Sequence, residues 1–475
     1  MSLTPRCGWL TTFLVAASAT AAFAAGENND LDKIPNVLIA PPPTPTPSPT
    51  SPQASAFTGT FYAEEAPALF SHRDDLAVPF PTSLGPNWIN RVFFDARAEW
   101  RLLPDVTTTY SGRFNIQAEG DLDFPTQGSF RNDFREGFIT WAARGETFLD
   151  AGRINVRNGV AYGFNPTDFF KTRSVVDEIS DDPRVLRENR LGTVMARGQQ
   201  VFAEGSVFLL YAPRFEKPSA VNPTNPAAFN GNFDHTNADD RFLLKGNYDI
   251  LPDFSPEFLV YHQGNRSQLG VNITRGVSEQ TTVYLEWAGG RRKSLIDDAT
   301  AYGIKTGSLP STVRPLLPGN DSESFQNDLS TGITYTTPTK LTLTLEYEYH
   351  QAGFSRRDWK NWFAIGAIPH QSPGVTAELW YLRLYALDQQ EPLSEHRMFF
   401  RAEWDDAFVR NLTLTAFSSI DLYDGSVLVQ TTADYRLSDH WTVGLLGESS
   451  LGSTRSDFGS NPQAALFQVS LSLYF

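Results

Sequence analysis

The last residues of the chain alternate between apolar and polar side chains. In the segment LFQVSLSLYF, every second position from Phe467 to Phe475 is apolar. The positions between them are Gln468, Ser470, Ser472 and Tyr474. Successive side chains of a β-strand point to opposite faces, so this pattern predicts an amphipathic strand over 465–475.

The same alternation recurs along the chain. Apolar and aromatic residues share one face of the segments 91–101, 110–119, 341–350 and 397–404, and the other face is charged or polar. A soluble antiparallel sheet can alternate in this way too. Charges of both signs on the polar face, apolar faces that end in Tyr or Trp, and segments of about 10 residues are more typical of a transmembrane β-barrel.

The connections between the segments are either short or long. Short turns occur at 144–146, 337–339 and 436–439, and long connections at 159–190, 212–239, 289–322 and 351–394. In bacterial barrels the short turns face the periplasm and the long loops face outward. The chain ends should both be periplasmic, so the strand number must be even. From a first strand at Phe57–Glu64 to the last at 465–475, we predict an all-β transmembrane antiparallel up-and-down barrel of about 18 strands.

One segment departs from the strand pattern. A strand over 376–388 would make the strand number odd and reverse the direction of the last strands. Pro373 after Ser372 suits the first position of a helix. The apolar residues Val375, Leu379, Leu382 and Ala386 follow at helical spacing. We therefore expect a short extracellular or lumenal helix near 373–388.

The N-terminal residues have a different composition. Arg6, the apolar run from Trp9 to Ala17 and the small residues Ala22 and Ala24 follow the order of a secretory signal peptide. Residues 41–53 alternate proline with Ser and Thr, which predicts an extended spacer. We therefore expect a signal peptide at 1–25, a Pro-rich periplasmic extension at 26–55 and a barrel in the bacterial outer membrane at 56–475.

Composition narrows the classes of function. The formal net charge of -15 argues against nucleic acid as a partner. The single cysteine, Cys7, falls in the predicted signal peptide, which excludes disulfides and thiolate sites from the mature chain. None of the 7 histidines lies in a recognisable nucleophile motif. We expect no cofactor and no catalytic residues.

The polar strand faces are rich in arginine and also carry acids. One role for these opposed charges is to select solutes in the lumen by charge and size. The alternative is that the charges pair across strands and only stabilise the interior of the barrel. The candidate lumen and selectivity residues are Arg91, Arg97, Arg113, Glu136, Arg153, Arg157, Glu346, Glu348, Arg397 and Arg401. Glu346, Glu348 and His350 could ligate a metal, but we favour pairing of the two acids with Arg397 and Arg401, so no metal site is expected.

The stretch 152–170, GRINVRNGVAYGFNPTDFF, is the most motif-like. Its first half predicts a strand, and Asn165, Pro166 and Asp168 are turn residues. A Gly-Arg strand before an Asn-Pro-x-Asp loop resembles a family of outer-membrane barrels of unannotated function, related to alginate-export-type porins. Later segments around 391–393, 404–406, 424–426 and 435–438 are similar to that family as well. The resemblance implies a loop that folds toward the lumen and passage of a solute or polymer.

The terminal strand also resembles a known signal. An amphipathic last strand ending in Phe is similar to the sorting signal of the bacterial barrel-assembly machinery, which implies that machinery as a partner and Phe475 as its assembly signal. Outer-membrane lipid and lipopolysaccharide are further expected partners, since arginines in the long loops can match lipopolysaccharide phosphates. Residues 26–55 could be a tether, bind a periplasmic protein or plug the pore.

These observations favour a porin-like channel over two other classes. The channel would pass hydrophilic solutes, anionic ones included, or a polysaccharide through an arginine-lined lumen. The alternatives are a structural or assembly barrel that anchors the periplasmic extension, and a barrel enzyme.

Overall fold

A computed structural model describes residues 57–82, 84–120, 127–176, 179–221, 231–251, 254–313, 316–317 and 323–475. In these residues, 18 strands form one sheet. The strands are β1 (Phe57–His72), β2 (Trp88–Leu103), β3 (Val106–Gly120), β4 (Gln127–Arg144), β5 (Thr147–Ile154), β6 (Thr193–Phe202), β7 (Gly205–Ala212), β8 (Arg241–Tyr248), β9 (Glu257–Gln263), β10 (Arg266–Ser278), β11 (Thr281–Arg292), β12 (Ser324–Thr336), β13 (Leu341–His350), β14 (His396–Trp404), β15 (Leu412–Asp421), β16 (Val427–Arg436), β17 (Trp441–Leu451) and β18 (Gln463–Tyr474). The helices are α1 (Pro183–Glu188), α2 (Phe233–Thr236), α3 (Leu295–Thr306), α4 (Arg356–Gly366), α5 (Pro373–Gln389) and the 3-10 turn η2 (Phe458–Ser460).

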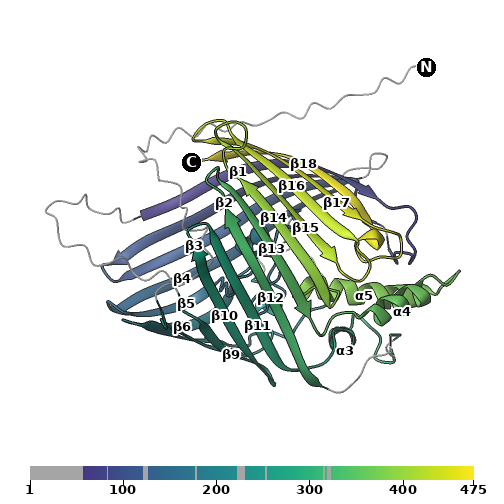
Figure 1. The fold of residues 1–475 in the computed structure, drawn as a ribbon, viewed down its shortest axis with the longest axis horizontal. Coiled ribbons are helices and arrows are strands. Elements are labelled where there is room, and N and C mark those ends of the chain that lie inside the picture. The colour runs from purple at the N-terminus through teal and green to yellow at the C-terminus, as the bar shows by residue number, and fades with distance from the viewer. Residues whose placement is uncertain are drawn as a thin grey trace.

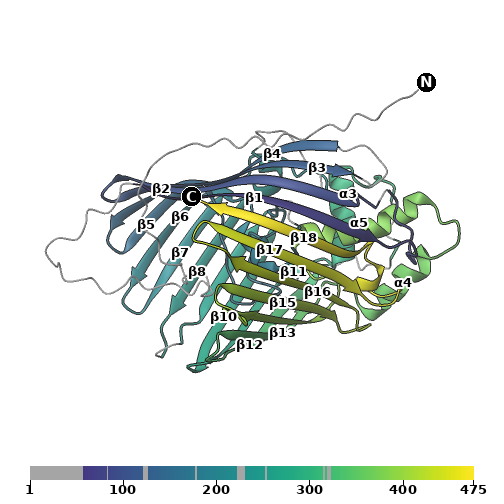
Figure 2. The same ribbon diagram turned by 90° about the horizontal axis from the view of Figure 1, so that it is seen from above.

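The sheet closes on itself through its first and last strands. Each strand pairs antiparallel with its neighbour in sequence, and β1 pairs with both β2 and β18. In the closing pair Tyr62 lies opposite Tyr474, so β1 begins where β18 ends. The result is a closed up-and-down barrel (Figures 1 and 2), which confirms the predicted fold and strand number. β1 extends to His72, eight residues beyond the predicted end at Glu64.

The outward face of the barrel is apolar. Phe94, Ile116 and Phe467 leave about half of their surface exposed, and their polar sequence neighbours point inward. Exposed apolar surface costs about 25 cal/mol per Å² in water, so a continuous apolar exterior indicates contact with lipid. The predicted assignment of apolar residues to the outside and charged residues to the lumen is confirmed in these strands.

The two rims of the barrel differ in the length of their connections. One rim carries the short turns, such as Thr337–Lys340, together with the start of β1 and the end of β18. The other carries the long connections, and α3, α4 and α5 lie together there (Figure 1). We call these the short-turn rim and the long-loop rim. The division follows the prediction from connection length.

The helices at the long-loop rim share an apolar core. Phe354, Trp362, Leu379 and Trp380 are buried there with residues of α3 and with Val78 from the β1–β2 connection. Helix α5 begins at Pro373, as predicted. None of the helices in the described ranges is long and apolar enough to cross a membrane. The predicted signal peptide and the extension at 26–55 lie outside the described residues.

Candidate functional site in the barrel lumen

Residues 155–176 and 179–192, from the connection between β5 and β6, fold into the barrel. The first part of this segment donates backbone hydrogen bonds to Glu286 on β11 and Glu346 on β13. Its later part contacts β16 and then returns to β3 and β4. We call it the lumen loop. It lies across the interior, which agrees with the sequence-based expectation of a loop folded toward the lumen.

Two fully buried glutamates of the wall bind the backbone of the lumen loop. Glu286 accepts hydrogen bonds from the backbone nitrogens of Val160 (2.8 Å), Ala161 (3.0 Å) and Thr167 (2.7 Å). Glu346 accepts hydrogen bonds from the backbone nitrogens of Tyr162 (2.9 Å), Gly163 (3.1 Å) and Phe164 (3.1 Å). Hydrogen bonds to a charged acceptor contribute about 1.5–3 kcal/mol each. These two carboxylates therefore fix the position of the loop.

Glycines allow the loop backbone to approach the wall this closely. Gly159 has a φ of +92°, and a Cβ there would lie 2.6 Å from the Glu286 carboxylate. A Cβ on Gly163 would collide with Glu348 and Phe399. Both positions need glycine, because a larger residue would separate the loop from the carboxylates.

The centre of the lumen loop is fixed by Asp168, which is 0% exposed. Its carboxylate accepts a hydrogen bond from Arg190 at 2.6 Å and lies 3.6 Å from Arg187. The two arginines follow it by about twenty residues on the returning part of the loop. Asp168 therefore closes the loop on itself, which is a structural role for this predicted loop residue.

Asn165 and Pro166 lie beside Asp168. The Asn165 side-chain amide donates to the carbonyl of Ala161 at 2.5 Å, and the backbone carbonyl of Asn165 accepts a hydrogen bond from the Lys171 ammonium at 2.8 Å. Burial lowers the pKa of the Lys171 ammonium, and nearby Glu391 opposes that shift. Asn165, like Asp168, supports the loop from inside, whereas Pro166 lines a cavity described below.

Arg113 and Arg135 bind the end of the loop. Asn189, which follows α1, accepts hydrogen bonds from Arg113 (3.1 Å) and Arg135 (2.8 Å). Both arginines also bind Asp95, at 3.0 and 2.5 Å. Arg113 is 5% exposed, so its guanidinium interacts with Asp95 and Asn189 rather than with solvent.

Apolar side chains fill one side of the lumen. The buried cluster comprises Ile154, Val156, Phe169, Phe170, Met195, Phe208, Leu210, Ala212, Leu243, Leu259, Tyr261 and Ala288. Phe169 of the lumen loop stacks on Tyr261 of β9, with ring centroids 4.4 Å apart. The sequence interpretation did not anticipate this cluster. Its inward members on β7 to β9 alternate with outward apolar residues, so these strands are apolar on both faces.

The other predicted lumen residues are mostly buried in polar networks. Arg153 is 2% exposed and donates to the carbonyls of Gly192 (2.8 Å) and Gly231 (2.7 Å). Arg91 and Glu348 are each 4% exposed. Arg153 therefore joins two loops in this structure, and its effect on selectivity stays a prediction.

The expected pairing of Glu346 and Glu348 with Arg397 and Arg401 is wrong for Glu346, which binds the lumen loop instead. Arg397 lies opposite Glu348 in register but binds Asp457 at 2.7 Å, and Arg401 binds Glu403 at 2.6 Å. Loops therefore provide the partners of Glu346 and Arg397, whereas the partner of Arg401 lies on the same strand.

Two predicted arginines remain more accessible. The Arg97 side chain is 50% exposed and lies 3.4 Å from Glu136. Arg157, in the lumen loop, is partly exposed and makes no hydrogen bond or ion pair with another described residue. Within the described ranges, no group of three or more potential metal ligands occurs.

Comparison with solved structures shows the fold that this chain shares with other proteins. No family model and no curated protein matches the chain. Pseudomonas aeruginosa OccK5 (OpdH) is similar with a TM-score of 0.50 and 8% identity, over 88% of this chain and 98% of that one. A BenF-like porin from Pseudomonas fluorescens Pf-5 has a TM-score of 0.51 and 10% identity over the same shares. The relation to alginate-export-type porins stays a prediction.

Proposed function

We propose that this chain is a porin-type channel of the bacterial outer membrane that passes hydrophilic solutes, preferring anions. The observation that carries the proposal is a closed barrel, apolar outside, whose interior is narrowed by a loop bound to wall carboxylates. One solved barrel of similar fold is described as a porin. A fixed constriction lined by charged groups selects solutes by size and charge.

The proposed path avoids the apolar cluster on the β6 to β11 side. It follows the wall formed by β1–β4 and β13–β18, whose buried side chains include the charged residues Arg91, Asp95 and Arg401. Arg97 and Arg184 have side chains 50% and 34% exposed. Partly exposed arginines in a narrow aqueous path favour anions, because a fixed charge is weakly screened at short range.

Replacing Arg157 by glutamine should reduce the preference for anions. A unit charge about 4 Å from a passing ion contributes ~1 kcal/mol in a water-like medium, which is a roughly fivefold change in the permeability ratio. The measurement is the reversal potential of the purified channel in a KCl gradient. Arg357→Gln is the matched control, because that side chain is 73% exposed on α4 at the long-loop rim. An unchanged ratio in the Arg157 variant would place this residue outside the ion path.

An enzymatic role has less support. His350, the histidine that the sequence places nearest to a lumen site, is 0% exposed and lies 2.8 Å from Asp328. A general base must reach the proton that it removes. His350 instead packs against Phe164 of the lumen loop, with ring centroids 5.8 Å apart.

We propose that the same chain contacts lipopolysaccharide at the long-loop rim and the barrel-assembly machinery through its last strand. Helix α4 exposes Arg356, Arg357 and Lys360, and arginine matches phosphate geometry. Residues 26–55 precede β1, which starts at the short-turn rim, so we propose that they extend into the periplasm.

Deleting residues 26–55 should leave barrel assembly and single-channel conductance unchanged, because β1 and its pairing with β18 begin after them. A photoreactive residue at Leu38 in the intact chain should capture any periplasmic partner. A sharp rise in conductance after the deletion would show that the extension plugs the pore instead.

A further inference from the structure

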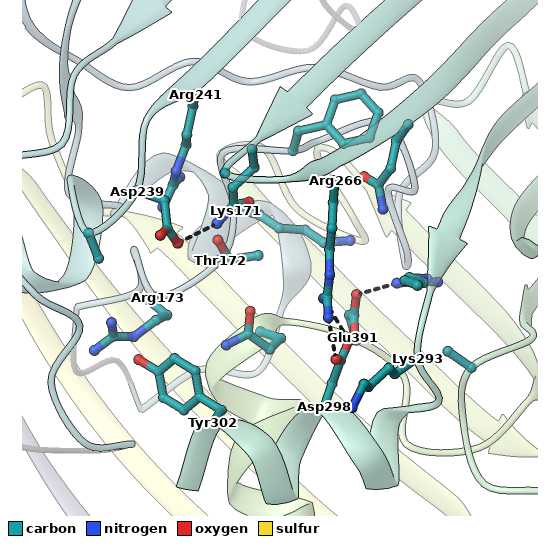
Figure 3. A pocket seen from close by; sticks show the side chains of 18 of the residues that line it. Lys171, Thr172, Arg173, Asp239, Arg241, Arg266, Lys293, Asp298, Tyr302 and Glu391 are labelled. Carbon is teal, nitrogen blue, oxygen red and sulfur yellow. Dashed lines mark hydrogen bonds and ion pairs between the residues drawn. The ribbon is translucent and has the colours of Figure 1, made fainter. Parts of the chain in front are cut away.

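A cavity of about 340 Å³ opens at the long-loop rim. Its wall includes the lumen-loop segment from Pro166 to Arg173, the hairpin between β9 and β10, and helix α3. In Figure 3, Arg241 and Asp239 lie on one side and Arg266, Asp298 and Glu391 on the other. The volume is within the usual range for small-molecule sites, about 300–1,000 Å³.

The cavity ends at the apolar cluster. Phe169 and Tyr261 line the cavity and also belong to that cluster, where their rings stack. Leu243 and Leu259 lie in the same packed layer and are 0% and 1% exposed. On this side the cavity therefore ends against packed apolar side chains, and the proposed path runs along the opposite wall.

The cavity has an excess of positive charge. Seven lysines and arginines line it, against five acids. The cations are Lys171, Arg173, Arg241, Arg266, Arg292, Lys293 and Lys305, and the acids are Asp168, Asp239, Asp298, Asp328 and Glu391.

Acidic partners neutralise several of these cations. Arg266 binds Asp298 through two hydrogen bonds of 2.9 and 2.6 Å. Arg292 binds Asp328 at 2.5 Å and Glu391 at 3.1 Å. These cations are already satisfied and leave little charge for a ligand.

Arg241 differs from them. It is 3% exposed, and its Nε and Nη1 atoms have no hydrogen-bond partner. The guanidinium lies over the Phe170 ring at 5.6 Å. The neighbouring Asp239 instead accepts a hydrogen bond from Gln263 at 3.1 Å. A buried guanidinium with unused donors is unfavourable unless an acceptor reaches it.

We propose that the cavity is a binding site for a small oxyanion, a carboxylate or a phosphate, with Arg241 as its anchor. A planar guanidinium presents donors that match the two oxygens of such a group. The site is separate from the solute path. A bound anion would bridge β8 and the lumen-loop segment that begins at Pro166.

Titration calorimetry of the purified barrel tests the site. The probes are potassium phosphate and potassium malonate, with glucose as the uncharged control. We expect saturable binding of at least one of the anions and none of glucose. Arg241→Gln should weaken that binding at least tenfold. The control is Arg410→Gln, at an exposed arginine in the turn between β14 and β15, and it should leave the binding unchanged. Absence of saturable binding by both anions, or equal binding by the Arg241 variant, would overturn the proposal.

Two further measurements separate this site from the channel function. Thermal unfolding of Arg241→Gln should occur at or above the temperature of the unsubstituted protein, because the substitution removes a buried charge whose Nε and Nη1 atoms have no hydrogen-bond partner. Single-channel conductance of this variant should also be unchanged. An altered conductance or permeability ratio would show that the cavity lies on the solute path and would contradict a separate site. A protein that conducts no ions but still binds the anion would refute the channel function alone.

Discussion

Replacing Glu286 and Glu346 together by glutamine is expected to raise single-channel conductance several-fold and to make the current noisy. Each carboxylate accepts hydrogen bonds from three loop backbone amides. A glutamine side chain has one acceptor oxygen, and its NH₂ group cannot accept from an amide. Each lost bond to a charged group removes about 1.5–3 kcal/mol, enough to release the lumen loop from the wall.

The control for this double substitution is Glu99→Gln. Glu99 is an exposed acid on the lumen face of β2, opposite Thr58 in register. The Glu99 variant therefore loses a negative charge from the lumen without losing a hydrogen bond to the lumen loop. Planar-bilayer recordings compare the variants. A double variant with the conductance of the unsubstituted channel would show that the lumen loop does not limit the current.

Replacing Phe475 by aspartate should strongly reduce barrel assembly. The Phe475 backbone nitrogen donates to the carbonyl of Phe61 at 2.9 Å, and its ring is 65% exposed on the apolar exterior. The aspartate carboxylate would face lipid. The substitution would also remove the aromatic residue that we expect to act as the assembly signal. The measurement is the fraction of heat-modifiable barrel, and a protease-sensitive form should accumulate.

Phe408→Asp is the matched control for this change. Phe408 is 79% exposed in the turn between β14 and β15 at the short-turn rim, away from the terminal strand. Normal assembly of both variants would count against Phe475 as the signal. A defect in both would show that the rim tolerates no added charge, and that the last residue has no special role.

The sequence predicts the barrel well, because lipid imposes a simple rule on every strand. Apolar residues such as Phe94 and Phe467 must face the lipid, and the residues next to them in sequence face the lumen. The resulting apolar–polar alternation identifies both the strands and which of their faces points outward. Helix α5 is recognisable because a strand there would leave the two chain ends at opposite rims. Both features depend on residues that lie close together in the chain, so a single sequence is enough to predict them.

The lumen is less predictable, because its contacts join residues far apart in the chain. The alternation shows that Glu346 points inward, but not that its partners are amides near Gly163. Leu210 and Leu243 alternate with residues that are also apolar, so the pattern gives no sign that one face packs inside the barrel. Arg241 resembles any other inward arginine until its lack of partners is visible.

The pairing of β1 with β18 also has a consequence for folding kinetics. Ser472 donates to Glu64 at 2.8 Å across a sequence separation of 408 residues. Contacts between such distant residues form slowly, since loop-closure entropy opposes them. Until β18 is complete, the sheet has two free edges, and free edges readily pair with other chains. Aggregation during biogenesis should therefore depend on how long the edge of β1 that pairs with β18 remains free.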